Sequence, residues 1–188
     1  PALNLVSPGQ RMNASFNPLH LVNTYGAFGH ITKVRREIVL EGSRVDEPRS
    51  DADWHPYQFR CKPGDVLRAP CVVSPYHYKL DWQLWFAALG EERKWEDAAR
   101  RGVPPDACRV DQWLLSFQWR LLQGVPEVRG LMGEQPFGSE APKFVRLTLW
   151  DYRFAPLEAK GLWWERSNPR PYCALTLDAA GLLAPAPP

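Results

Sequence analysis

The clearest hydrophobic pattern in the chain is an alternation of side chains over residues 143–154 (KFVRLTLWDYRF). Val145, Leu147 and Leu149 fall on one side of an extended chain, and large aromatic or polar residues fall on the other. A period of two is that of a β-strand, whose successive side chains point to opposite faces. We therefore expect a strand at the centre of a sheet, with Trp163-Trp164 pairing beside it and the Pro-rich end fraying.

Three earlier segments are also rich in β-branched and aromatic residues, namely 19–28, 31–45 and 54–61. Such composition is typical of strands. The second segment ends at Gly42-Ser43, which favours a turn, and a polar loop follows it. These segments predict three further strands.

The period changes to that of a helix after residue 80. Trp82, Trp85, Phe86 and Leu89 recur at i, i+3, i+4 and i+7, behind Asp81 as an N-cap and before Gly90 as a stop. Such a stripe requires an apolar partner, so we expect these four side chains to form the buried aromatic face of a short helix.

A second helix is predicted over residues 112–123. Asp111 can cap it, and Gly124 and Pro126 follow it. The segment between the two helices predicts at most one or two exposed helical turns. The expected fold is therefore α+β, an antiparallel β-sheet or sandwich with an inserted block of two or three helices at about 81–123.

The length of 188 residues favours one compact domain. We expect an N-terminal arm or linker over 1–16, a single domain over 17–176 and a Pro-rich tail over 177–188. The chain starts without Met and without a signal-peptide pattern, which favours a piece of something longer. No stretch within it has the roughly 20 apolar residues of a membrane helix.

Charge and motifs give no case for nucleic acid binding or for catalysis. The formal net charge is +2, without a long run of one sign. Known catalytic, phosphate-binding and metal-binding motifs do not occur, so we expect no catalytic residue, cofactor or metal. Of the histidines, His77 lies near Asp81, which could orient it as a base, but a structural histidine is the simpler interpretation.

Four cysteines are too few for a disulfide scaffold, and none has C-x-x-C spacing. Between Cys61 and Cys71, Pro63 and Gly64 favour a tight turn that could bring the two sulfurs together. A disulfide there implies an oxidising compartment, whereas two buried thiols in a reducing one remain the alternative. We expect Cys108 and Cys173 to be free thiols, since one lies in a poorly patterned loop and the other near a fraying end.

Asn13 begins an Asn-Ala-Ser acceptor for N-glycosylation. It lies in the expected N-terminal arm, where a glycan could attach. The candidate holds only if the chain enters a secretory lumen.

Several strings together resemble the C-terminal half of the lipase maturation factor family. They are QRMN at 10–13, LVNTYGAFG at 21–29, CKPGD at 61–65 and SPYHYKLDWQLWFAAL at 74–89, with weaker similarity at QPF 135–137, YRF 152–154 and WW 163–164. The similarity spans roughly residues 10–166. Cys61 and Cys71 favour the branch similar to lipase maturation factor one over its paralogue. Relatives of this family also occur in bacteria, so the chain could come from a bacterial relative.

The resemblance implies a function that the residues alone do not indicate. The family consists of multi-pass membrane proteins that, in animals, help dimeric lipases to fold in the endoplasmic reticulum. This chain would then be a lumenal domain that binds client lipases, with transmembrane segments upstream, or it would belong to a bacterial membrane protein. The loop at 91–109 and the C-terminal end match no family string.

Three kinds of function stay open at this point. A folding-assistance domain needs an exposed apolar patch and no reactive group. A small-ligand or carbohydrate-binding module would show a concave pocket with stacked aromatic rings. An enzyme would need convergent titratable residues in one cleft.

Overall fold

The computed structural model describes residues 34–71, 78–89, 111–177 and 181–185. These residues belong to one compact unit that begins at Val34. The expected arm at 1–16, the boundary at residue 17, the strand at 19–28 and Asn13 all lie outside the described residues.

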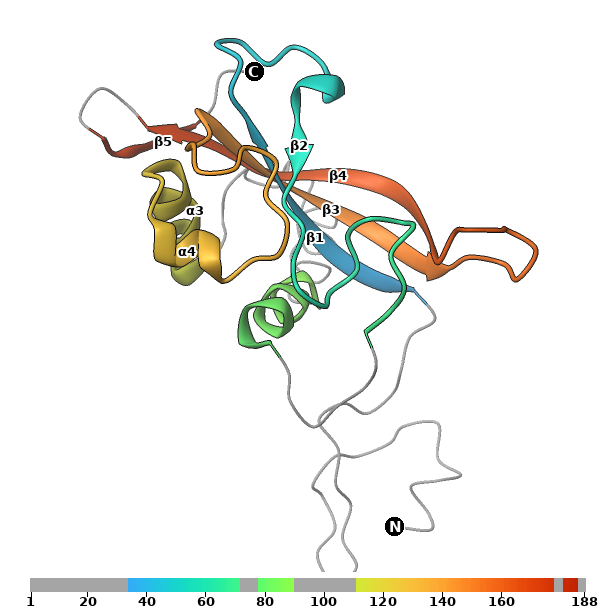
Figure 1. Ribbon diagram of the computed structural model, residues 1–188. Coiled ribbons are helices and arrows are strands. Elements are labelled where there is room, and N and C mark those ends of the chain that lie inside the picture. The colour runs from blue at the N-terminus through green and yellow to red at the C-terminus, as the bar shows by residue number, and fades with distance from the viewer. Residues whose placement is uncertain (1–33, 72–77, 90–110, 178–180, 186–188) are drawn as a thin grey trace, which may run out of the picture. The chain divides into compact units, whose positions relative to one another are not determined.

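A five-stranded antiparallel sheet forms the framework of this unit (Figure 1). Its strands are β1 (Arg35–Ser43), β2 (His55–Pro56), β3 (Phe144–Phe154), β4 (Trp164–Leu177) and β5 (Leu183–Pro185). Their order in the sheet is β2-β1-β3-β4-β5, so β3 is the central strand, as its alternation predicts. A short 3-10 helix, η1 (Asp51–Asp53), precedes β2.

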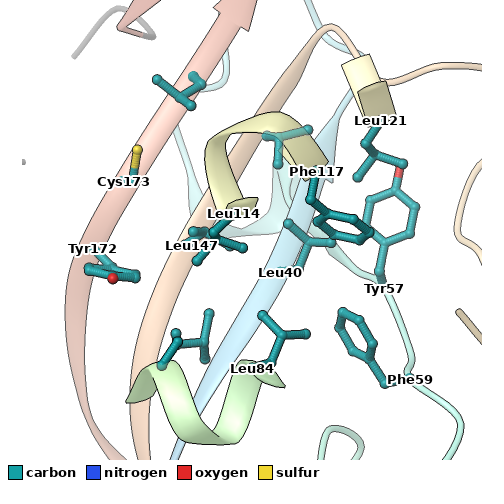
Figure 2. Packing of buried hydrophobic residues seen from close by; sticks show 14 of the residues in the cluster. Leu40, Tyr57, Phe59, Leu84, Leu114, Phe117, Leu121, Leu147, Tyr172 and Cys173 are labelled. Atoms are coloured by element: carbon teal, nitrogen blue, oxygen red, sulfur yellow. The ribbon is translucent and has the colours of Figure 1, made fainter. Parts of the chain in front are cut away.

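Helices cover one face of the sheet. They are the helical residues 79–89, α3 (Gln112–Leu122) and α4 (Pro126–Gly130). Figure 2 shows Leu84, Leu114 and Phe117 from these helices directed at Leu40 and Leu147 of the sheet. The predicted α+β class, with a helical block inserted between strands, is confirmed.

The opposite face of the sheet carries a smaller buried cluster of Val39, Tyr152 and Trp164. Val39 and Tyr152 come from the strand positions that alternate with the main core positions. Because both faces of β3 are largely covered, its polar-looking face is also half-buried or buried over most of its length.

The prediction that Trp82, Trp85, Phe86 and Leu89 form the buried face is wrong. Trp82 and Phe86 are 46% and 53% exposed, and their rings stack on each other at 5.3 Å, while Trp85 and Leu89 are half-buried. The residues that face the sheet are Leu84, Ala87 and Ala88, each at most 8% exposed. Two alanines let the helix backbone approach the sheet closely, so the small residues are on the inner side.

Two further expectations about strands also need correction. Only His55–Pro56 of the segment 54–61 is a strand, although Tyr57 and Phe59 are still buried in the core. Gly42, where the sequence predicts a turn, lies within β1. A Cβ atom added at this position would come within 2.8 Å of the Phe137 side chain and 2.9 Å of the Tyr57 side chain. The glycine is therefore needed for close packing.

The described residues after Trp164 form strands, where the sequence predicts a fraying end. β4 runs to Leu177, and β5 pairs with its end through Leu175↔Pro185 and Leu177↔Leu183, inside the predicted tail. Proline is tolerated here because β4 is irregular, with register shifts against β3 and a left-handed Asn168 at φ 54°.

Candidate interaction surface

The described residues hold no group of three or more His, Cys, Asp or Glu side chains arranged to bind a metal ion. His55 is exposed on β2 and lies edge-on to Phe137. His20, His30 and His77 lie outside the described residues. In the part of the chain that the structure describes, no helix has the length and apolar character needed to cross a membrane.

Cys61 and Cys71, the pair that the sequence predicts, are joined by a disulfide with a Cα–Cα distance of 5.5 Å. We call residues 61–71 the disulfide loop. Within it, Asp65 accepts a bond from the Leu67 N–H through its side chain and from the Arg68 N–H through its carbonyl, at 2.9 and 3.2 Å. These local bonds give the loop a defined turn of the kind that aspartate favours.

Asp81, at the start of the helical residues 79–89, anchors the disulfide loop. Its Oδ2 accepts hydrogen bonds from the backbone N–H groups of Cys61 and Lys62 at 2.6 and 2.8 Å. Asp81 is 6% exposed, so these are buried, charge-assisted hydrogen bonds. The residue predicted as a helix cap therefore ties the helix to the disulfide loop.

A buried ion pair holds the loop to β1. The Lys62 Nζ lies 3.2 Å from Glu37 Oε2, and both side chains are at most 3% exposed. Arg35 binds the other oxygen of Glu37 at 2.5 Å, and Lys62 also donates to the Pro63 carbonyl. Desolvation lowers the pKa of Lys62, while the negative charges of Glu37 and Asp81 oppose that shift.

The disulfide loop also packs on the base of the β3–β4 hairpin. The Val66 carbonyl accepts the backbone N–H groups of Trp163 and Trp164 at 2.9 and 3.1 Å. The Trp164 indole donates to the Arg68 carbonyl at 2.9 Å, and the Tyr152 hydroxyl donates to the Gly64 carbonyl at 2.8 Å. Burial raises the pKa of Tyr152, so its hydroxyl remains a donor at neutral pH.

Five large apolar side chains are exposed on this loop and hairpin. We call them the hairpin surface: Leu67 (60% exposed), Phe154 (68%), Leu157 (100%), Leu162 (40%) and Trp163 (49%). Figure 1 shows the hairpin extending beyond the helical layer. Single exposed apolar residues are ordinary, but four of these five lie within residues 154–163, on the hairpin and its turn, and such a local concentration makes this part of the chain a candidate contact site.

The Trp82–Phe86 stack is a second exposed aromatic group. It lies on the last helical residues before the undescribed segment that starts at residue 90. The hairpin surface, in contrast, is carried wholly by described residues, so its exposure and support are both defined. It is the better candidate.

Trp54 and Trp150 do not provide open stacking platforms. Arg146 lies over the Trp54 ring and Arg166 over the Trp150 ring, each at 4.6 Å from the ring centroid. A guanidinium on a ring face occupies the position that a sugar would take. This arrangement gives no support to the carbohydrate-binding alternative.

The expectation that Cys173 is a free thiol is wrong, because Cys173 is disulfide-bonded. It is 3% exposed and lies opposite Leu147 in the regular part of β4. The expectation failed because it placed Cys173 near a fraying end, whereas the strand continues past it. Cys108, expected to be the other free thiol, lies outside the described residues.

Sequence reasoning missed the buried Glu37–Lys62 pair and the hairpin surface. Lys62 lies in a turn sequence, where a lysine is ordinarily solvated. A signal for the surface does exist: the segment FAPLEAKGLWW at 154–164 places apolar residues among turn-forming and charged ones, between two strands. Large side chains in a turn have no inner face to occupy.

Comparison with known proteins identifies relatives over most of the chain. The sequence profile of the lipase maturation factor C-terminal domain matches residues 21–101 and 103–174. Lipase maturation factor 1 is 40% identical in both cattle and humans, over 90% and 88% of this chain. Lipase maturation factor 2 of chicken is 35% identical over 86% of it.

The chain spans 28% of the length of the bovine protein and 21% of that of the chicken protein. The match therefore concerns one part of much longer relatives. No solved structure shows a significant match to this chain.

Proposed function

Because the chain belongs to the lipase maturation factor family, we propose that it is the part of such a factor that binds client lipases while they fold and assemble. In this proposal it acts by protein binding and not as an enzyme. The proposal rests on the family for the kind of client and on the hairpin surface for the mode of action.

The exposed hairpin surface is the observation that carries the proposal. Its five apolar side chains lie on a scaffold braced by a disulfide, a buried ion pair and several buried hydrogen bonds. A protein that has not yet folded or assembled exposes apolar surface of its own, and burial of two such surfaces against each other is favourable. A rigid scaffold also lowers the entropy lost on binding.

The compartment that fits best is an oxidising one. Disulfides persist in secretory lumens and the bacterial periplasm but are rare in cytosol. We place the domain on the lumenal side of the endoplasmic reticulum membrane, or on the outer side of a bacterial membrane for a bacterial protein. Membrane segments upstream and glycosylation at Asn13 belong to the same proposal.

Binding to a refolding client lipase tests the proposal. The 188-residue chain, produced in an oxidising compartment, would be mixed with a lipase monomer refolding from denaturant and with the assembled lipase dimer. We expect a complex with the refolding monomer. Absence of any complex, with a correctly disulfide-bonded chain, would refute the proposal.

A further inference from the structure

The ends of the disulfide loop are joined by noncovalent contacts as well as by the disulfide. We infer that Arg68 and Asp81 are positioning residues for the Cys61–Cys71 bond: they keep the loop closed when both cysteines are reduced, so that the bond forms readily and resists reduction by glutathione. The bond is then a structural one and not a redox switch. This inference concerns the loop itself and does not depend on client binding.

The side chain of Arg68 connects the two arms of the chain that lead to the disulfide. We call residues 59–62 the first arm and residues 66–71 the second arm. The Arg68 guanidinium, from the second arm, donates to the Phe59 carbonyl at 2.5 Å and also to the Lys62 carbonyl, both in the first arm. Arg68 therefore spans the same gap as the disulfide.

Asp81 fixes the first arm from outside the loop. Its carboxylate accepts the backbone N–H groups of Cys61 and Lys62, and the residue is 6% exposed. Because these bonds hold the backbone of Cys61 itself, moving this residue away would remove donors from a buried carboxylate, which is costly. The position of Cys61 is thus set by a contact that involves no sulfur.

The second arm is fixed by the base of the β3–β4 hairpin. The Trp164 indole donates to the Arg68 carbonyl, and the Val66 carbonyl accepts the backbone N–H groups of Trp163 and Trp164. Both arms therefore have anchors other than the disulfide. These anchors keep the Cα atoms of the two cysteines near their 5.5 Å separation in the reduced chain.

The bond forms by exchange with a disulfide oxidant, for which oxidised glutathione serves as the probe. The two cysteine thiols give up two protons and two electrons, and oxidised glutathione takes them up to become two molecules of reduced glutathione. The equilibrium depends on the effective concentration of one cysteine thiol at the other, which falls when the loop can open. A loop that stays closed therefore favours the disulfide. Since Cys71 is exposed, glutathione can reach the bond, and its resistance is one of equilibrium.

Equilibration in glutathione buffers tests the inference. The folded 188-residue chain would be incubated in mixtures of reduced and oxidised glutathione and quenched with acid. Free thiols would then be blocked, and mass spectrometry of the peptides carrying Cys61 and Cys71 would give the oxidised fraction. We expect Arg68→Met and Asp81→Ala each to lower the equilibrium constant for bond formation at least about tenfold, because an open loop lowers the effective concentration. Asp81→Asn keeps an oxygen acceptor and should recover part of the loss.

Leu84→Ala is the matched control for general destabilisation. Leu84 lies on the same helix as Asp81 but packs in the main core with 0% exposure. Its truncation should destabilise the fold without changing the glutathione equilibrium of the folded protein. Circular dichroism in the same buffers shows whether each variant is folded, and Arg68→Met carries the test if Asp81→Ala is not.

Three results would overturn the inference. An unchanged equilibrium in folded Arg68→Met would show that other contacts position the cysteines. A shift in Leu84→Ala as large as that in Arg68→Met would show that general destabilisation is responsible. Complete reduction of the unmodified folded chain by a glutathione mixture as reducing as that of the cytosol would mark the bond as a switch.

Discussion

Trp163 and Trp164 are adjacent in the sequence but have opposite environments. Trp164 is 6% exposed, stacks on Phe154 and donates its indole N–H to the disulfide loop, whereas Trp163 is 49% exposed. Trp164 is the first residue of β4 and Trp163 comes directly before it, and neighbouring side chains of an extended chain point to opposite sides. The base of the hairpin therefore stabilises the fold, and its exposed side and apex are available for binding.

The largest expected effect is at the buried member of this pair. Trp164→Ala removes a buried ring and its hydrogen bond to Arg68, and should lower the free energy of unfolding by about 3–5 kcal/mol. Trp163→Ala should lower it by less than about 1 kcal/mol, since half of its surface is already in water. Urea denaturation of both variants measures the two effects, and equal losses would contradict the assignment.

The buried ion pair below the hairpin should give the next largest effect. Lys62→Met leaves Arg35 as the ionic partner of the Glu37 carboxylate among the residues that the structure describes, so we expect a loss of about 3 kcal/mol in the free energy of unfolding. In the double variant Lys62→Met/Glu37→Met, both members of the ion pair are removed together, and much of the loss should be recovered. Urea denaturation of the single and double variants checks this, and purely additive losses would argue against a coupled pair.

Lys62 also makes stability depend on pH. Its pKa is lower in the folded state than its ordinary value of 10.5, so between the two values the unfolded chain binds more protons. Its contribution to the free energy of unfolding should therefore increase as pH rises towards 10.5. Lys62→Met should remove this increase in a pH series of urea denaturations; an unchanged pH slope would contradict the buried position of the lysine.

The disulfide contributes on a similar scale. Cys61→Ser/Cys71→Ser opens a loop of about ten residues, and the chain-entropy model gives a loss of about 2.5–3 kcal/mol. The loop should keep its position on Trp164 because several hydrogen bonds and the Lys62 pair remain. Thermal unfolding measures the loss, and near-ultraviolet circular dichroism reports whether the tryptophan environment persists.

The smallest effects are expected at the outer face of the helical residues 79–89. Trp82→Ala and Phe86→Ala should each lower the free energy of unfolding by less than about 1 kcal/mol, because both rings are about half exposed. Leu84→Ala, on the inner face, should lower it by about 2–5 kcal/mol. A reversed order in urea denaturation would restore the aromatic face that the sequence predicts.

Much of the framework could be predicted from the sequence because its patterns are strong. The alternation at 143–154 identifies the central strand, and the signals around 111–126 identify α3, since both follow the repeat of their secondary structure. The short helix at 79–89 shows the limit of that reasoning. Its bulky residues share one stripe, but small residues on another side permit closer packing on the sheet.

The candidate site was harder to predict. The disulfide followed from a local turn, whereas the Glu37–Lys62 contact joins residues that are far apart in the sequence and depends on the tertiary fold. Most of the hairpin surface lies on the turn between β3 and β4, which has no periodic pattern of its own. Pro126, which the sequence predicts to end α3, also begins α4, a first-turn position that proline favours.

Site-specific crosslinking tests the central claim most directly. A photoreactive residue would replace Leu157 in the 188-residue chain, and in a parallel sample Leu131, before irradiation with a refolding lipase monomer. The account predicts a covalent adduct with the monomer from position 157, little from position 131, and loss of the adduct once the lipase has assembled. Equal labelling from both positions, or labelling from 131 alone, would contradict the assignment of client binding to the hairpin surface.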